Sequence, residues 1–133
     1  MEQSTQKTID QCVRASHAGE ISFADAVGAL MQAGVASYFA DYRAASTTYY
    51  LSAGETYTLP LGSRGQAIPQ RFDTAALQAA IQGAQSGKVK YPEFLKLSAA
   101  AGCVGYLVWI AGRHVSYFGH SGEVHVERFP DSK

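Results

Sequence analysis

Apolar residues along the chain fall first at helical spacing and then in strand-like segments. Ile9 and Val13 lie four residues apart on one predicted helix face, and Thr5 is a candidate N-cap for this helix. A second helix is predicted after Ser22, with Ala33-Gly34 as its stop. β-branched and aromatic residues then predict three strands, the last two forming a hairpin with Ser-Ala-Gly at its tip: 35–42, 46–51 and 56–59.

The same order of patterns returns in the second part of the chain. Asp73 is the matching N-cap candidate, Leu77 and Ile81 share a helix face, and Pro92 suits the first turn of the next helix. Three further strands are predicted, with His-Ser-Gly at the hairpin tip: 103–111, 114–119 and 123–129. A stretch rich in Gly, Pro, Ser and Gln separates the two parts and is the predicted linker.

Residues of the two parts also match one by one when the sequence is shifted by 68 positions without a gap. The matches include glycines, aromatic residues and acidic residues: Gly19 with Gly87, Ala33-Gly34 with Ala101-Gly102, Tyr38 with Tyr106, Tyr49 with Tyr117, and Gly54-Glu55 with Gly122-Glu123. So many special residues at one offset predict an internal duplication.

We therefore expect a single α+β domain over residues 1–133, built by internal duplication of a helix-helix-strand-strand-strand unit. Repeat 1 is predicted at about 4–60, the linker at about 60–71 and repeat 2 at about 72–130. The strands should form one mostly antiparallel sheet, or two packed sheets, with the helices packed on one side.

Composition excludes several classes of function. The 133 residues include 11 Lys or Arg and 11 Asp or Glu, so the basic surface of a nucleic-acid-binding protein is not predicted. No apolar run approaches the roughly 20 residues that span a bilayer, and we expect a cytoplasmic protein with no membrane partner. Cys12 and Cys103 are far apart and are predicted to be buried free thiols. No metal or cofactor is expected.

Polar chemistry concentrates in the second predicted hairpin. A two-residue turn at His120-Ser121 places four polar side chains on one face: His114, His125, Glu123 and Glu127. Two histidines with carboxylates on neighbouring strands can hold a transition metal, or can act as a general base and its orienting partner. We favour the alternative of an ordinary solvent-facing sheet surface, because no nucleophile stands at a recognisable spacing.

A second candidate site occurs in both parts of the chain, as a hydroxyl residue and two aromatic residues followed by Gly-Glu. Turn glycines and core aromatic residues explain this pattern structurally. The functional alternative is a pair of related surface grooves for a peptide or a small ligand. The predicted groove residues are Tyr50, Glu55, Phe118 and Glu123.

Several motifs resemble a known family. They are Tyr91-Pro-Glu-Phe, Ala101-Gly-Cys-Val-Gly-Tyr, the run from Gly112 to Pro130, and Gly34-Val35-Ala-Ser-Tyr38. Together they are similar to the YbcV-like family of small enterobacterial and prophage-encoded proteins, over nearly the whole chain. That family is functionally uncharacterised, and some members are labelled phage envelope proteins. The resemblance therefore implies a prophage setting and provides no catalytic residues.

We expect a non-catalytic binding or accessory protein of prophage origin, which forms a homodimer through an exposed strand edge or binds a protein partner. An enzyme is the alternative hypothesis, either metal-dependent or acid/base, with the four polar side chains of the second hairpin in a concave site. A secretion or assembly chaperone is a third hypothesis, which requires a continuous apolar groove. The sequence does not separate the binding protein from the chaperone.

Overall fold

The computed structural model describes residues 1–61 and 67–130, and the middle of the predicted linker, residues 62–66, lies outside this description. The described residues form four helices and six strands in an α+β fold. The N-terminal half contains α1 (Gln3–His17), α2 (Phe23–Gln32), β1 (Val35–Asp41), β2 (Ser46–Leu51) and β3 (Thr56–Pro60). The C-terminal half contains α3 (Thr74–Gln85), α4 (Tyr91–Ala100), β4 (Cys103–Trp109), β5 (His114–Gly119) and β6 (Val124–Arg128).

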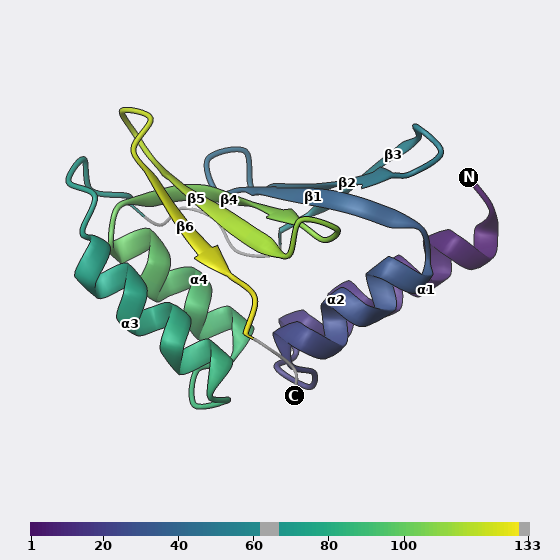
Figure 1. The fold of residues 1–133 in the computed structure, drawn as a ribbon, viewed down its shortest axis with the longest axis horizontal. Helices are drawn as coiled ribbons and strands as arrows, with labels where there is room; N and C mark the ends of the chain where they lie inside the picture. Colours follow the sequence, from purple (N-terminus) through teal and green to yellow (C-terminus); the bar gives the residue numbers. More distant parts are fainter. Residues whose placement is uncertain (62–66, 131–133) are drawn as a thin grey trace.

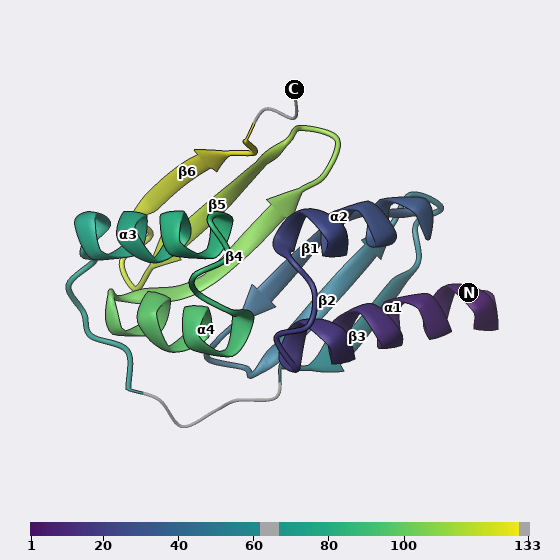
Figure 2. The same cartoon turned by 90° about the horizontal axis from the view of Figure 1, so that it is seen from below.

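All six strands form one antiparallel sheet in the order β3-β2-β1-β4-β5-β6. The helices lie in a layer below this sheet in Figure 1. Figure 2 shows them on one face as two pairs, α1 with α2 and α3 with α4. The predicted antiparallel sheet with helices on one side is confirmed, as a single sheet rather than two packed sheets.

The two halves meet at the central strand pair, β1 and β4. Two backbone hydrogen bonds flank this seam, from Tyr42 N to Val104 O at 3.0 Å and from Ile110 N to Ala36 O at 3.2 Å. A shift of 68 positions converts one of these bonds into the other. The same order of elements thus occurs twice, once on each side of the seam, whereas a duplication in the history of the sequence remains a prediction.

The hydrophobic core lies between the sheet and the helices. Ile9 on α1, Leu77 on α3 and Val108 on β4 are completely buried. Cys12 and Cys103 are buried free thiols, which confirms their prediction. No helix in residues 1–61 or 67–130 has both the length and the apolar character needed to cross a membrane.

Two of the predicted helix caps are confirmed by hydrogen bonds. Ser22 Oγ accepts from Asp25 N at 3.1 Å, and Asp73 Oδ1 accepts from Ala76 N at 3.1 Å. Each bond satisfies a backbone donor that has no partner inside the helix. These caps set the starts of α2 and α3.

The predicted N-cap at Thr5 is wrong. α1 begins at Gln3, after Glu2, and no side chain caps it. Thr5 is therefore a helical residue in the first turn. Just before this helix, the Met1 amine pairs with the Glu55 carboxylate, and Met1 also packs against the core.

The predicted register of the hairpin formed by β5 and β6 is wrong by one residue. Gly119 N donates to Glu123 O at 2.9 Å, so the loop contains His120, Ser121 and Gly122 rather than two residues. Gly122 has a φ of 87°, the left-handed conformation that closes a loop of this length. Because side chains alternate along a strand, this shift moves every β6 side chain to the opposite face of the sheet.

Candidate ligand-binding cavity

A cavity of about 220 Å³ lies between the sheet and the two helix pairs. Helices α1 to α4 and the strands β1, β2, β4, β5 and β6 contribute to its lining, which is mostly apolar, with Glu127 and Arg128 coming from β6. Counterparts from both halves line it, such as Ile21 with Val89 and Tyr38 with Tyr106. The cavity therefore spans the seam, and neither half could form it alone.

Four tyrosines on the four central strands face this cavity. Tyr49, Tyr38, Tyr106 and Tyr117 come from β2, β1, β4 and β5 in spatial order, and each is about 5 or 6% exposed. Their rings form two neighbouring pairs, with centroids 5.3 Å apart for Tyr38 and Tyr49 and 5.7 Å apart for Tyr106 and Tyr117. Cross-strand pairing of the same residues explains this arrangement.

A histidine and a tyrosine from different halves form one wall of the cavity. The ring of His17 stacks on that of Tyr91, with centroids 5.5 Å apart and an angle of 4° between the planes. The Tyr91 and Tyr106 hydroxyls share a hydrogen bond of 2.9 Å. Burial lowers the pKa of His17 and raises the pKa of Tyr91 to about 12, so this wall is uncharged at neutral pH.

The hydroxyls of three tyrosines that line the cavity have no hydrogen-bond partner among the described residues: those of Tyr38, Tyr49 and Tyr117. The tyrosine hydroxyls that do have a hydrogen-bond partner are those of Tyr42, Tyr57, Tyr91 and Tyr106. In the described part of the chain, no side-chain oxygen or nitrogen that is sealed from water lacks a partner. The three unpaired oxygens therefore open on the cavity, where a ligand or water can reach them.

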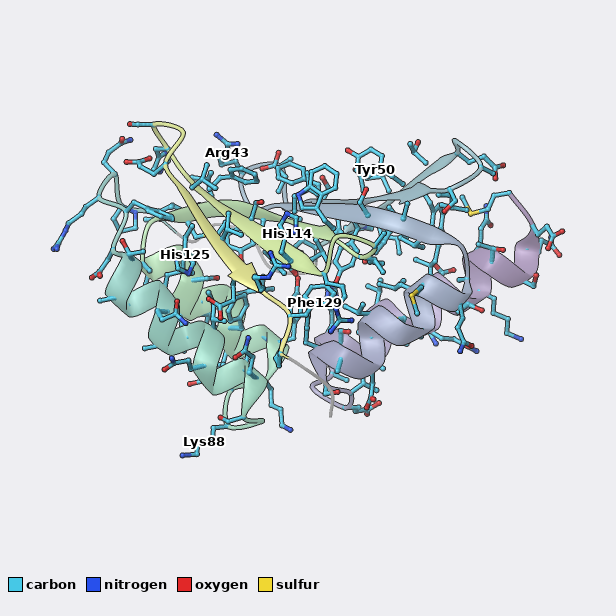
Figure 3. All side chains as sticks on the ribbon, in the orientation of Figure 1. Arg43, Tyr50, Lys88, His114, His125 and Phe129 are labelled. Carbon is cyan, nitrogen blue, oxygen red and sulfur yellow. The ribbon has the colours of Figure 1, made fainter. Side chains whose placement is uncertain are left out.

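The two described residues that follow β6, Phe129 and Pro130, line one side of the cavity. Phe129 lies on the helix side of the sheet in Figure 3, and its ring meets the ring of Phe23 edge-on at 5.6 Å. The Arg113 guanidinium lies 5.5 Å from the centre of the Phe129 ring. These contacts join the segment after β6 to α2 of the other half, so both halves hold this wall.

The four polar candidates of the second hairpin do not converge. His125 and Glu127 lie on the helix side of β6, with His125 Nε2 3.3 Å from Glu127 Oε1. His114 is on the opposite face, and Glu123 Oε1 accepts from Ser121 N at 2.9 Å in the loop. Among the described residues, no group of three or more His, Cys, Asp or Glu side chains could hold a metal ion. The concave site required by the enzyme hypothesis does not form from these four residues.

The predicted groove residues separate into two kinds of environment. Tyr50 and Phe118 line one shallow depression on the open face of the sheet, where Figure 3 shows Tyr50 above the strands. Glu55 pairs with the Met1 amine, and Glu123 caps the second hairpin loop. The aromatic members thus share a surface, whereas the two glutamates hold turns and the N-terminus.

Comparison with protein families gives one match, which covers residues 23–128 and is to a family described as proteins of unknown function, DUF1398. The chain belongs to the DUF1398 family. A comparison with curated proteins finds no match. The DUF1398 match includes all six strands, whereas α1, which contributes Cys12 and His17 to the cavity, lies before it. The narrower YbcV-like resemblance and the prophage setting remain predictions for this DUF1398 member.

The cavity was not predicted from the sequence. Tyr117 was predicted to be a core residue, and its burial agrees with that prediction. The sequence does contain one sign of the difference between the halves. A shift by 68 positions aligns Phe23 with Tyr91, so the hydroxyl at this position is present only in the C-terminal half. This difference marks one position at which the two halves of the DUF1398 fold differ in hydrogen bonding.

Proposed function

We propose that this protein binds a small, mostly apolar ligand in the cavity between the sheet and the helix pairs. The strongest support is the combination of apolar walls with three tyrosine hydroxyls that have no partner among the described residues. Protein interiors are packed as densely as organic crystals, and buried polar groups are normally hydrogen-bonded. The three tyrosine hydroxyls obey the second rule because they are open to the cavity, and an apolar cavity of about 220 Å³ with a few accessible polar groups is typical of a binding site.

The chemistry of the lining favours binding over catalysis. Burial raises the pKa of Tyr38 well above its ordinary range and also raises the pKa of the Cys12 thiol, so both groups stay protonated at neutral pH. A neutral phenol and a neutral thiol can hold a ligand by packing and hydrogen bonds. They are poor general bases and poor nucleophiles in this state.

This proposal gives a specific form to the binding role expected from the sequence. The proposed binding cavity lies between the sheet and the helices, whereas the grooves predicted from the sequence lay on the surface of the protein. A homodimer, a protein partner, a cytoplasmic location and a prophage origin remain predictions from the sequence, as does the chaperone hypothesis.

The first test is native mass spectrometry of protein purified without an affinity tag, followed by titration with p-xylene. The mass spectrum reports any ligand that is retained through purification. In the titration of ¹⁵N-labelled protein, we expect saturable chemical-shift changes centred on Ala26, Tyr38 and Tyr106, which line the cavity. Changes scattered over the surface, or none, would contradict the proposal.

A blocking variant connects binding to this cavity. Ala26 on α2 lines the cavity at the position that Phe94 occupies in the C-terminal half, so Ala26→Phe adds a ring that the fold already accommodates once. We expect it to weaken p-xylene binding about tenfold or more. Gly28→Ala is the matched control, since Gly28 is on the same helix, does not line the cavity, and has open space around an added methyl group.

If Ala26→Phe does not fold, as judged by circular dichroism, Ala84→Val replaces it. Ala84 lies on α3 and lines the cavity from the other helix pair. Full p-xylene binding by a folded blocking variant would place the ligand elsewhere and refute the proposed site.

A further inference from the structure

The Tyr38 hydroxyl lacks the partner that its counterpart possesses. In the C-terminal half, Tyr106 shares a hydrogen bond of 2.9 Å with Tyr91. The matching position in the N-terminal half is Phe23, which has no hydroxyl to offer to Tyr38. Tyr38 is 6% exposed, and its oxygen opens on the cavity.

On the basis of the proposed binding function, we infer that Tyr38 is a specificity-determining residue that hydrogen-bonds an oxygen atom of the ligand. We further infer that the ligand is an uncharged, single-ring aromatic compound that carries a hydroxyl or carbonyl group. The ligand oxygen would supply to Tyr38 the bond that Tyr91 supplies to Tyr106.

Aromatic side chains around the cavity support a ring-shaped ligand. Phe23, Tyr91, Phe94 and Phe129 line it together with the four strand tyrosines. Aromatic rings attract one another through edge-to-face and offset contacts, which add to the gain from burial. A volume of about 220 Å³ is below the usual range for drug-sized ligands and suits a single ring.

The uncharged character of the ligand is inferred from His17 and the strand tyrosines, because the charged lining residues, Glu20, Lys90, Glu127 and Arg128, are two of each sign. His17 stays neutral because burial lowers its pKa, and the strand tyrosines stay protonated because burial raises theirs. A charged ligand would lose its hydration without gaining an opposite charge at these groups. The protonated Tyr38 hydroxyl can donate to a ligand oxygen and can accept from a ligand hydroxyl.

Tyr38 differs from the other two unpaired tyrosines in its place in the fold. Tyr49 and Tyr117 are counterparts of each other, so both halves leave this hydroxyl without a partner. Among the four strand tyrosines, the halves differ in hydroxyl bonding only at the pair of Tyr38 and Tyr106, and these residues lie on the two strands of the seam. Tyr49 and Tyr117 are therefore matched controls for the loss of an unpaired hydroxyl.

The test compares p-cresol with p-xylene, which have nearly the same shape and differ by a hydroxyl in place of a methyl group. Dissociation constants for both are measured by chemical-shift titration. We expect the wild-type protein to bind p-cresol about five- to tenfold more tightly, the effect of one net hydrogen bond. Tyr38→Phe should reduce this ratio to about one and leave p-xylene binding nearly unchanged.

Two further variants separate the hydroxyl from the shape of the site. Phe23→Tyr offers Tyr38 an internal partner, so it should raise the melting temperature and abolish the preference for p-cresol. Tyr49→Phe and Tyr117→Phe should both retain the preference. All of these variants change one oxygen atom, and circular dichroism verifies that each is folded.

The outcomes distinguish this inference from the proposed function. Equal binding of the two probes by the wild type refutes the specificity inference and leaves the cavity as a binding site. A preference that survives Tyr38→Phe, or that is lost equally in Tyr49→Phe or Tyr117→Phe, also refutes it. Binding of neither probe refutes both the inference and the proposed function.

Discussion

The two halves place different side chains at matched positions below the same sheet. In the C-terminal half, Tyr91 on α4 bonds to Tyr106, whereas Phe23 on α2 leaves the counterpart Tyr38 unpaired. His17 on α1 stacks on Tyr91, and the residue that matches His17 is Gln85. A nearly symmetric scaffold thus encloses an asymmetric interior, which allows a single ligand orientation to be favoured.

A second exchange of residues follows the same rule. The Tyr42 hydroxyl lies 2.8 Å from Ser98 Oγ, and this hydrogen bond joins the residue that follows β1 to α4. The matched positions hold Ile110 and Leu30, which are both buried. At one pair of matched positions, both residues are polar and bonded to each other, and at the other pair both are apolar. Neither pair therefore leaves a buried hydroxyl without its partner. This differs from Tyr38, where one partner alone is missing.

The largest expected effect tests whether the matched core positions are equivalent. Ile9 and Leu77 are counterparts and are both completely buried. We expect Ile9→Ala and Leu77→Ala each to lower the free energy of unfolding by about 2–5 kcal/mol, because each leaves a cavity in the core. Urea denaturation measures both, with Met31→Ala at the exposed Met31 as the control. A cost below about 1 kcal/mol for either variant would contradict their equivalence.

The next effect concerns two matched glycines after the second helix of each half. Gly34 and Gly102 have φ values of 96° and 92°, so alanine is strained at both by about 1–2 kcal/mol. A methyl group on Gly102 would also overlap the carbonyl oxygen of Arg71, whereas that on Gly34 meets open space. We expect Gly102→Ala to cost about 1–3 kcal/mol more than Gly34→Ala. Equal melting temperatures for the two variants would contradict this expectation and would mean that the backbone at Arg71 shifts without cost to admit the methyl group.

A smaller effect is expected from the pair of Tyr42 and Ser98. Ser98→Ala leaves the Tyr42 hydroxyl buried without its partner and should cost about 1–3 kcal/mol. Tyr42→Phe should cost less, because Ser98 Oγ still donates to Phe94 O at 2.7 Å. A double-mutant cycle by urea denaturation gives the coupling energy. A coupling near zero would mean that the bond contributes nothing to stability.

The smallest effect is a dependence of stability on pH through His17. Burial lowers its pKa in the folded state below the ordinary value of 6.5, so the unfolded chain binds the proton more readily. This contribution to stability is complete above pH 6.5 and is lost as the pH falls from 6.5 towards the folded-state pKa. His17→Gln, which copies Gln85, should make the urea midpoint less sensitive to acid. If the urea midpoint of the variant depends on acid as strongly as that of the wild type, titrating groups other than His17 cause the dependence.

The sequence predicted the elements and the layers of this fold well, because spacing and caps are local properties. Ser22 and Asp73 cap helices as expected. The start of α1 was missed because this helix begins without a side-chain cap, so no capping residue marks it in the sequence. The register of β6 was missed because a loop of three residues, rather than two, depends on the conformation of Gly122.

The candidate cavity was harder to predict than the fold. Strand alternation assigned Tyr117 to a buried face, and it is buried. Whether a buried hydroxyl finds a partner depends on a side chain from another helix, and a single sequence does not reveal which one approaches. The exchange of Tyr91 for Phe23 became meaningful only when the structure placed Tyr91 against Tyr106.

The seam between β1 and β4 has a consequence for how the chain folds. Each hairpin and each helix pair forms from residues that are close in sequence, but the seam joins Ser37 to Trp109. Closing a long loop costs entropy before the contacts across it can compensate. We therefore expect the two halves to gain structure rapidly and the seam to form in the rate-limiting step. The cavity would then be the last part of the molecule to exist, completed at the moment when the sheet becomes continuous.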